Sequence, residues 1–380
     1  MPNEYSQLCP VLFGEGAADQ LPDKIRAFGG GPVLFITDPG IRSTGLVDRM
    51  ADAVRAAGME ADIFDEVEAD APDAVIDLCN EKVLQRKKYR VLVGVGGGSS
   101  MDSAKAIAVL AENPGPVSRY FMTWQAGREV KLILIPTNSG TGSEVTPMCV
   151  IHDTVNNIKT GILRPADYAI VDPALTVSAP PKVTAYTGMD ALSHAVEAYT
   201  CTSRNAHSDL LALECVRLIA RNLRTACDDG KDMAARSALS FASNIAGIAF
   251  AESSVHAGHA IAHETGVMLE QPHGLLCAIV TPVVIEYSAP CFPERMVALA
   301  NALGATDAAP ETAGKLAADA VRKLARDLGI PSLKELGIRR EDVVACAAGA
   351  VEHNIFINTA PKPTGVPEIA ELLGQMYDTY

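Results

Sequence analysis

The sequence lacks the paired cysteines that organise disulfide-rich or zinc-bound folds. Its nine cysteines are spread along the chain and include no C-x-x-C pair. A disulfide framework or a thiolate zinc cluster needs paired, closely spaced cysteines, so neither is expected. We interpret the cysteines as buried or partly buried free thiols in a reducing compartment, and we predict a cytoplasmic protein.

Basic charge and long apolar runs are also scarce. Thirty-two Lys and Arg face 46 Asp and Glu, which leaves a net charge of −14. A field of this sign repels phosphodiester backbones, so a nucleic-acid partner is not expected. The most apolar stretch, residues 275–285, contains Thr281 and Pro282 and is shorter than the roughly 18 residues of a spanning helix. Residues 1–15 carry no basic segment before an apolar one, so neither a secretion signal nor a membrane partner is expected.

What the sequence does contain is the composition and patterning of a two-domain globular protein. It has 380 residues, 48% of them hydrophobic and 21% charged. The first half alternates short β-branched runs with amphipathic stretches, which is typical of a parallel α/β sheet. The expected strands cover residues 33–37, 91–95, 132–135 and 169–171, and the expected helices cover residues 46–57, 73–88 and 101–111.

Beyond about residue 180, helical periodicity replaces the strand pattern. Helices are expected over residues 208–227, 233–250 and 313–328, the last one capped by Gly329 with Pro331 beyond it. We therefore predict an α/β domain over residues 1–180 and a mainly helical domain over residues 181–380.

A glycine run follows the predicted strand at residues 91–95. Gly96, Gly97, Gly98 and Ser99 lead directly into a helix, where backbone N–H groups and the helix dipole favour an anion such as a pyrophosphate. The run is neither a Walker A motif nor a complete G-x-G-x-x-G, since Ser99 takes the place of the last glycine. A tight turn without a ligand remains the alternative.

Two further polar segments follow predicted strands. Residues 137–143 (TNSGTGS) offer hydroxyl and amide groups that suit a dinucleotide, unless they form only a solvated loop. Asp38 also follows a strand, where an acid can bind a ribose 2′-hydroxyl and repel a 2′-phosphate. Asp38-Pro39-Gly40 is equally consistent with a simple turn.

Histidines give the strongest signal. Asp190 and His194, and again His259 and His263, are four positions apart and share a helix face. With His273 they offer a carboxylate and imidazoles for a divalent first-row metal, Fe²⁺ or Zn²⁺ rather than Mg²⁺. Hydrogen-bonded core histidines are the alternative. Cys277 could add a thiolate, although a packing role fits it better.

Four motifs, in this order along the chain, resemble those of the iron-containing (group III) alcohol dehydrogenases. They are residues 96–105 (GGGSSMDSAK), 136–146 (PTNSGTGSEVT), 187–194 (TGMDALSH), and 259–263 (HAIAH) with 272–274 (PHG). The resemblance covers essentially the whole chain. It implies a Rossmann-like N-terminal domain and an all-α C-terminal domain, the dehydroquinate synthase-like architecture, with metal and nicotinamide in the cleft between them.

The resemblance also implies roles for individual residues. The metal ligands would be Asp190, His194, His259 and His273, and His263 would be a catalytic proton-relay residue. The cofactor-binding residues would be Asp38, Gly97, Gly98, Ser99, Asp102, Thr137, Thr141 and Lys159. The cofactors would be NAD(H) and Fe²⁺, with Zn²⁺ as the other candidate ion. A homodimer or larger homo-oligomer is implied as well.

The chain departs from the family pattern at three places. Glu264-Thr265 stands where Pro-Leu is frequent, and residues 67–72 (VEADAP) replace an Asn-Pro-Thr turn. Near the C-terminus, residues 360–362 (APK) replace Asn-Pro-Arg. These departures indicate a subgroup with its own substrate, but they do not identify that substrate.

The reaction predicted on these grounds is reversible hydride transfer between NAD(H) and a small primary alcohol or aldehyde. The metal would act as a Lewis acid on the substrate oxygen. For an anionic aldehyde, the candidate anchors are Lys159, Arg164 and Lys362. Two alternatives remain open: a zinc-dependent polyol dehydrogenase of the glycerol type on the same scaffold, and a non-catalytic metal- and nucleotide-binding protein.

Overall fold

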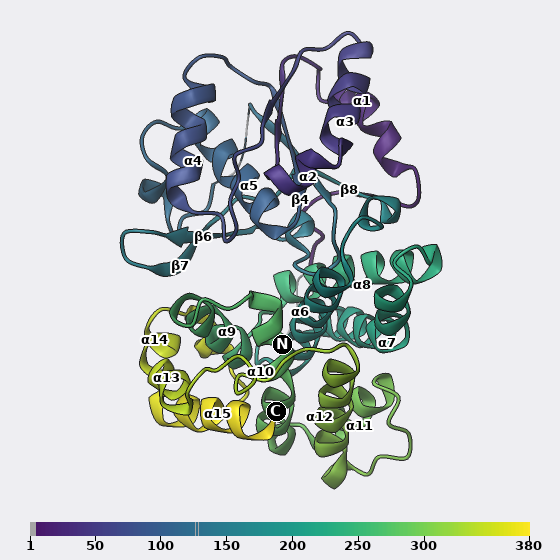
Figure 1. The fold of residues 1–380 in the computed structure, drawn as a ribbon, viewed down its shortest axis with the longest axis vertical. Coiled ribbons are helices and arrows are strands. Elements are labelled where there is room, and N and C mark those ends of the chain that lie inside the picture. The colour runs from purple at the N-terminus through teal and green to yellow at the C-terminus, as the bar shows by residue number, and fades with distance from the viewer. Residues whose placement is uncertain (1–4, 126, 128) are drawn as a thin grey trace. The chain divides into compact units, whose positions relative to one another are not determined.

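A computed structural model describes residues 5–125, 127 and 129–380 (Figure 1). Contacts within the chain divide it into two compact units. The α/β unit comprises residues 7–138 and 142–177. The helical unit comprises residues 178–380 together with residues 139–141 and the described residues before Gln7. The division after Val177 lies close to the boundary expected at residue 180.

The α/β unit is built on a sheet of six strands, all paired in parallel within the described residues, in the order β1-β8-β5-β4-β2-β3. A separate antiparallel hairpin is formed by β6 and β7. The strands are β1 (Val11–Phe13), β2 (Val33–Ile36), β3 (Ala61–Phe64), β4 (Val91–Gly96), β5 (Lys131–Pro136), β6 (Met148–Asp153), β7 (Ile158–Leu163) and β8 (Tyr168–Val171).

Helices cover both faces of this sheet, which is why its central strands are apolar apart from Lys131 at the start of β5. The helices are α1 (Leu21–Ala27), α2 (Pro39–Ser43), α3 (Leu46–Ala56), α4 (Asp73–Cys79) and α5 (Gly98–Glu112). Figure 1 shows α1 and α3 on one side and α4 and α5 on the other. Phe35 and Val93 pack with α1 and α3, whereas Gly94 faces α5 so closely that a Cβ would lie 2.7 Å from that of Ala104. The result is a three-layered α/β/α unit.

The expected α/β elements are present with small shifts of their ends, except in one place. The helix expected over residues 73–88 is wrong in its second half, because α4 ends at Cys79 and a short π-helical turn, Asn80–Leu84, replaces it. Strands β1, β3, β6 and β7 were not expected. The first is short and half-buried, so it carries too little pattern to be recognised.

The helical unit packs long helices around one apolar core. The helices are α6 (Pro181–Thr200), α7 (Ala206–Asp228), α8 (Met233–Glu252), α9 (Ala257–Met268), α10 (His273–Ser288), α11 (Pro293–Ala302), α12 (Pro310–Asp327), α13 (Arg340–Ala345), α14 (Ala347–Glu352) and α15 (Val366–Thr379). Helices α7, α8 and α12 match the three expected helices, and Gly329 caps α12 in the left-handed region (φ 69°).

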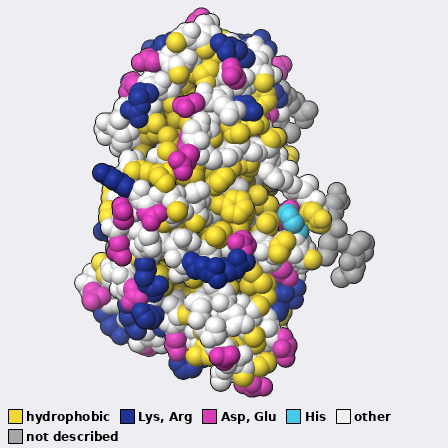
Figure 2. Space-filling model, turned by 90° about the vertical axis from the view of Figure 1, so that its right-hand side faces the viewer, with side chains coloured by type: hydrophobic (Ala, Val, Ile, Leu, Met, Phe, Trp, Pro, Cys, Tyr) yellow, Lys and Arg dark blue, Asp and Glu magenta, His cyan; other side chains and the backbone are white. Residues whose placement is uncertain are grey.

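Surface and core properties agree with an ordinary globular chain. On the face drawn in Figure 2, Lys and Arg side chains lie interspersed with Asp and Glu. Within the described residues, all nine cysteines carry free thiols, as expected from their spacing. Of the described helices, only the segment from His273 to Cys291 is long and apolar enough to cross a membrane. Most of that segment is buried in the helical unit, as is usual for a core helix.

Candidate functional site

Three neighbouring strands of the α/β unit end at the same edge of the sheet. Strand β4 pairs with β2 on one side and with β5 on the other, and Gly96 is in register with Pro136. Asp38, the glycine run and Thr137 follow these strand ends. In a parallel sheet this carboxyl edge is where ligands bind. The structure therefore brings the predicted nucleotide-binding segments together.

The glycine run forms a sharp turn into the first turn of α5. Gly96 has a φ of 151°, and a Cβ at this position would lie 2.5 Å from Oγ of Ser100, so only glycine fits. Gly97 precedes the helix, which begins at Gly98 and continues for 15 residues. The first N–H groups of such a helix have no intrahelical partner, and with the helix dipole they favour a phosphate group.

Asp38 has two roles in the protein itself. Its Oδ1 accepts a 3.0 Å hydrogen bond from the backbone N–H of Ile41, so it caps α2. Its Oδ2 accepts a 2.9 Å hydrogen bond from the hydroxyl of Ser100, which lies on the first turn of α5. The turn interpretation is thus correct in part. Because a carboxylate can accept about four hydrogen bonds, Asp38 keeps the capacity to bind a ribose hydroxyl.

Two other predicted cofactor residues contact Asp70. Oγ of Ser99 accepts a 3.1 Å hydrogen bond from the backbone N–H of Asp70, and Nζ of Lys159 lies 2.5 Å from its carboxylate. Lys159, which comes from β7, is therefore compensated by a negative charge. Ser99 and Lys159 therefore both bond to Asp70, which belongs to the segment that replaces the frequent Asn-Pro-Thr turn.

Asp102 is buried, and it holds the second polar loop onto α5. Its carboxylate accepts a 2.6 Å hydrogen bond from the hydroxyl of Ser143 and a 3.2 Å hydrogen bond from the N–H of Val150. The fully buried Lys105 donates to Ser143 over 2.7 Å and lies 3.4 Å from Asp102. Burial raises the pKa of Asp102. Thr141, from the same loop, belongs to the helical unit.

The predicted metal ligands converge in the helical unit. Helix α6 carries Asp190 and His194, α9 carries His259, and His273 is the first residue of α10. Oδ1 of Asp190 lies 3.7 Å from Nδ1 of His194, 3.7 Å from Nε2 of His259 and 3.4 Å from Nε2 of His273. One carboxylate oxygen is thus surrounded by three imidazoles.

These atoms are buried without the partners that buried polar atoms normally have. Oδ1 of Asp190, Nδ1 of His194 and Nε2 of His259 make no hydrogen bond to any described residue. Such atoms are rare in folded proteins and need an explanation. A divalent cation explains them, because carboxylate oxygen and imidazole nitrogen are ligands that Fe²⁺ and Zn²⁺ accept. The residues present therefore fit a metal ion.

Cys277 lies at the same place. The ligand atoms of Asp190, His259, His273 and Cys277 all lie within 4.8 Å of one another. Sγ of Cys277 is 3.4 Å from Nε2 of His273. Burial, together with the charge of Asp190, raises the pKa of Cys277 well above its usual value. A neutral thiol is a poor metal ligand, so this environment favours a packing role.

Burial and neighbouring charges shift the pKa values of the residues in the cluster. Burial alone would raise the pKa of Asp190, but His194 and His273 hold it well below its usual value. Burial lowers the pKa of His194 to about 3. Burial also acts to lower the pKa of His259, but Glu197 and Asp190 outweigh it and raise this pKa to about 9. His194 is therefore neutral at physiological pH, as a metal ligand must be.

Sequence reasoning missed the groups around these ligands. Glu197 accepts a hydrogen bond from Nδ1 of His259. It lies one turn beyond His194 on α6, so helical spacing could have revealed it. The ring of Phe250 stacks on His194 with 4.3 Å between ring centroids. Phe250 comes from α8, and no sequence pattern connects it to the motifs.

His263 lies beside the cluster and is only partly buried. Its Nδ1 is 3.2 Å from Oδ1 of Asn354, and its ring centroid is 5.2 Å from that of His273. The ring of Phe356 approaches it edge-on at 5.7 Å. Asn354 and Phe356 come from the C-terminal part of the helical unit, which the motifs do not cover. His256 is buried beside Glu197, and its Nε2 bonds to the hydroxyl of Thr200 over 2.9 Å.

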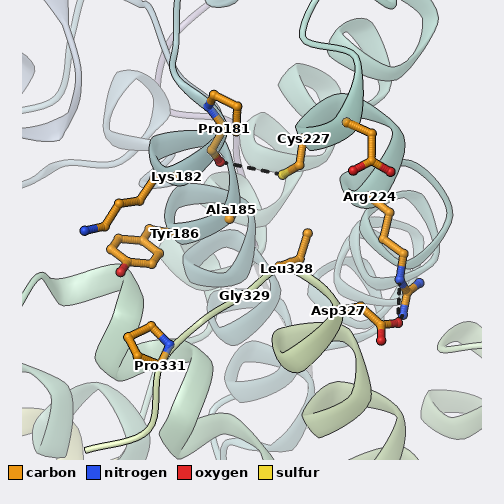
Figure 3. A pocket seen from close by; sticks show the side chains of 11 residues that line it. Pro181, Lys182, Ala185, Tyr186, Arg224, Cys227, Asp327, Leu328, Gly329 and Pro331 are labelled. Atoms are coloured by element: carbon orange, nitrogen blue, oxygen red, sulfur yellow. Dashed lines mark hydrogen bonds and ion pairs between the residues drawn. The ribbon is translucent and has the colours of Figure 1, made fainter. Parts of the chain in front are cut away.

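A separate pocket of about 490 Å³ lies at the start of α6, against the end of α12. Figure 3 shows Arg224 paired with Asp327 on one side and the thiol of Cys227 donating to the carbonyl of Pro181 on the other. The described residues that line it include no predicted metal or cofactor residue. The pocket is therefore distinct from the histidine cluster.

Comparisons with known proteins agree with this arrangement. The family model described as iron-containing alcohol dehydrogenase matches residues 10–173. The model described as Fe-containing alcohol dehydrogenase family, C-terminal, matches residues 184–377. Long-chain-alcohol dehydrogenase 1 of Geobacillus thermodenitrificans is 37% identical, with 92% of this chain and 90% of the relative covered.

Two further similarities extend over nearly the whole chain. The NAD-dependent methanol dehydrogenase of Bacillus methanolicus is 32% identical, with 95% of this chain and 96% of the relative covered. A crystal structure of a 1,3-propanediol oxidoreductase superposes with a TM-score of 0.94 at 33% identity, over 99% of this chain and 100% of that chain. The chain belongs to the iron-containing alcohol dehydrogenase family.

Proposed function

We propose that this protein is an NAD-dependent oxidoreductase that interconverts a small primary alcohol and its aldehyde with the help of a divalent metal, Fe²⁺. The observation that carries the proposal is the convergence of three histidines on Oδ1 of Asp190. That oxygen, Nδ1 of His194 and Nε2 of His259 are buried and make no hydrogen bond to any described residue. Relatives that are named as alcohol dehydrogenases, one of them NAD-dependent, support the reaction class.

The metal would be held by Asp190, His194, His259 and His273. When bound, a divalent ion supplies a Lewis acid that stabilises negative charge on the substrate oxygen and polarises the carbonyl in the reverse direction. In the oxidation, the alcohol carbon loses a hydride to NAD⁺ and its hydroxyl loses a proton. The products are the aldehyde, NADH and one proton.

The dinucleotide would bind at the carboxyl edge of the sheet. Gly97, Gly98 and Ser99 would bind the pyrophosphate at the start of α5, and Thr137 and Thr141 would contact the cofactor from the second loop. Asp38 would accept the ribose hydroxyl and disfavour a 2′-phosphate. Lys159 would reach the cofactor from β7. Asp102 would act by fixing the second loop, since its oxygens already bond to Ser143 and Val150.

His263 would carry the proton toward solvent. A carboxamide oxygen only accepts hydrogen bonds, so His263 donates from Nδ1 to Oδ1 of Asn354. A neutral His263 then has its lone pair on Nε2, the atom that can take up a proton. Because the residue is partly exposed, the proton can leave to bulk water.

The three candidate anchors for a charged substrate already have partners. Lys159 is paired with Asp70, and Nζ of Lys362 lies 4.1 Å from the ring centroid of Tyr287. Arg164 is buried, is 3.0 Å from Asp167 and bonds to the carbonyl of Val130. These contacts favour an uncharged alcohol as the substrate.

Two other functions stay as outcomes of the test. A zinc-dependent polyol dehydrogenase would use the same ligands, and it would be favoured if Cys277, whose Sγ lies within 4.8 Å of the ligand atoms of Asp190, His259 and His273, bound the ion as a thiolate. A non-catalytic metal- and nucleotide-binding protein would bind both cofactors without turnover.

The decisive experiment combines metal analysis with activity. The purified, metal-depleted protein is loaded anaerobically with Fe²⁺ or Zn²⁺, and NADH oxidation is measured against a panel of small aldehydes and, in reverse, with primary alcohols and glycerol. We expect one ion per chain and aldehyde reduction with Fe²⁺. Glycerol oxidation with Zn²⁺ would replace the proposal by the polyol reaction. Metal binding without turnover of any substrate would support the non-catalytic metal- and nucleotide-binding protein instead.

The cellular setting follows from the same observations. We propose a cytoplasmic enzyme, since free thiols are expected in a reducing compartment. A homodimer or larger homo-oligomer is the proposed assembly, and light scattering coupled to gel filtration measures it directly.

A further inference from the structure

Both carboxylate oxygens of Glu197 accept hydrogen bonds from one short segment of the helical unit, residues 256–259. Its Oε1 accepts a 2.6 Å hydrogen bond from Nδ1 of His259. Its Oε2 accepts hydrogen bonds from the backbone N–H groups of His256, at 2.6 Å, and Gly258, at 3.1 Å. Glu197 is only 2% exposed, so water does not compete for these donors.

These contacts determine which nitrogen of His259 is available. A carboxylate can only accept, so Nδ1 of His259 carries the proton. The lone pair of the neutral ring is then on Nε2, which faces Oδ1 of Asp190 at 3.7 Å. Nε2 is also the nitrogen that is buried without a hydrogen-bond partner among the described residues. Glu197 therefore selects the one tautomer in which the free nitrogen points toward Asp190.

The backbone beside His259 leaves room for this carboxylate. A Cβ on Gly258 would lie 2.5 Å from Oε1 of Glu197 and 3.0 Å from Cγ2 of Val284. Any larger residue would displace the carboxylate from His259 or push the two helices apart. Gly258 is thus a spatial requirement of the hydrogen bond between α6 and α9.

We propose that Glu197 is a positioning residue for the metal centre: it fixes the tautomer and the ring orientation of His259, and Gly258 provides the space it needs. The inference rests on the proposed function, because it assumes that His259 is a ligand. Outer partners of this kind generally change metal affinity by about 10–100-fold.

A glutamine at position 197 has the same shape as glutamate, but it cannot accept hydrogen bonds at both of its terminal atoms. If the amide oxygen of a Glu197→Gln side chain faces the two backbone N–H groups, its NH₂ group faces Nδ1 of His259. The ring must then accept at Nδ1 and carry its proton on Nε2, where it blocks the metal. If the amide turns the other way, its NH₂ group meets two N–H donors. Neither arrangement satisfies the two backbone N–H groups and also leaves Nε2 of His259 free of a proton.

The first test compares Glu197→Gln with a matched control. Glu252 also accepts from a histidine, over 2.7 Å to Nδ1 of His207, and its side chain is 6% exposed, but that pair lies outside the metal cluster. The metal-depleted proteins are titrated with Zn²⁺ in competition with a chelator. We expect Glu197→Gln to weaken Zn²⁺ binding by about 10–100-fold and Glu252→Gln to leave it unchanged.

Two readouts separate positioning from a general structural defect. The visible spectrum of the Co²⁺-loaded protein reports ligand geometry, and we expect it to change in Glu197→Gln but not in Glu252→Gln. NADH binding, measured by the fluorescence of the nucleotide, is expected to stay within about twofold in both variants, because the glycine run and Asp38 belong to the α/β unit, whereas Glu197 and Glu252 belong to the helical unit. Loss of NADH binding together with metal binding would instead indicate misfolding and would contradict a positioning role.

A second pair of variants tests the same inference independently, in case Glu197→Gln does not fold. Gly258→Ala adds one methyl group against Glu197, whereas Gly266→Ala adds the same group to the same helix, α9, at an ordinary distance of 3.5 Å from Leu276. We expect Gly258→Ala to weaken Zn²⁺ binding and Gly266→Ala to leave it unchanged. Equal Zn²⁺ affinity in Glu197→Gln, Gly258→Ala and the unsubstituted protein would overturn the inference. Absence of Zn²⁺ binding to the unsubstituted protein would overturn the proposed metal site itself.

Discussion

Oδ1 of Asp190 lies 3.4 Å from Nε2 of His273, although the two residues belong to different helices, α6 and α10. The contact forms because His273 is the first residue of its helix, directly after Pro272, where the chain enters the unit's core. His273 is also the most exposed of the four proposed ligands, at 24% of its side chain. It is therefore the ligand whose removal should disturb packing least.

We predict that His273→Ala loses both metal and activity while it remains folded. Removal of a direct ligand should weaken Zn²⁺ or Fe²⁺ binding by more than the roughly 10–100-fold typical of an outer partner. Metal content by elemental analysis and NADH oxidation with an aldehyde measure the two effects. His152→Ala, which removes a histidine of the β6–β7 hairpin, is the control. Full metal occupancy in His273→Ala would contradict the ligand assignment.

Cofactor selection at Asp38 gives the second prediction. Asp38→Asn removes the negative charge but keeps an acceptor oxygen for Ile41 and an NH₂ group that can donate to the hydroxyl of Ser100, whereas Asp38→Gly removes both contacts. The charge should repel the 2′-phosphate of NADP, so both variants are expected to lower the ratio of kcat/KM for NAD to that for NADP by about tenfold or more. Glycine costs little as a helix cap, so folding should persist. An unchanged ratio in both variants would remove Asp38 from cofactor selection.

The sequence predicted the architecture well where pattern and spacing act locally. Strand β4 and the turn at Gly96 follow from an apolar run that ends in glycines, and the pairs on α6 and α9 follow from helical spacing. Parallel pairing then places the ends of β2, β4 and β5 at one edge. These relationships need no knowledge of tertiary packing.

Partners that come from distant segments were not predictable. Asp70 contacts both Ser99 and Lys159, but it lies in an irregular stretch with φ of 62° that no periodicity marks. Likewise, Asn354 reaches His263 from beyond the last motif. Such contacts depend on the conformation of loops that pack over the helices and strands, and a sequence pattern does not predict that conformation.

Cys277 supplies the third prediction, which addresses the choice between iron and zinc. Because burial raises the pKa of its thiol well above the usual value, we expect the thiol to stay protonated and not to bind the ion. Cys277→Ala should therefore keep Zn²⁺ and Fe²⁺ affinity within about twofold and lower thermal stability only slightly, as small core deletions do. Cys215→Ala, another buried cysteine of the helical unit, is the control. A selective loss of Zn²⁺ affinity in Cys277→Ala would identify a thiolate ligand and favour the zinc enzyme.

The pH dependence of metal binding gives the last prediction. In the metal-free protein, burial acts to lower the pKa of His259, but Glu197 and Asp190 raise it to about 9, above the value of 6.5 for an unperturbed histidine. The bound proton therefore stabilises the metal-free fold below about pH 6.5, and this contribution is lost as the pH rises through about 9. A metal ion must displace that proton, so its affinity should rise by up to about tenfold per pH unit over the same interval.

The measurement is the difference in thermal midpoint between Zn²⁺-loaded and metal-depleted protein at pH 6, 7 and 8. We expect the difference to grow with pH, because the metal-free form loses stability while the loaded form binds its ion more tightly. Glu197→Gln removes the charge that contributes most to raising the pKa of His259. In this variant the difference in thermal midpoint should therefore grow less steeply with pH. A difference that stays constant from pH 6 to 8 in the unsubstituted protein would mean that His259 releases no proton to solvent when the ion binds, and His259 would then not be a ligand.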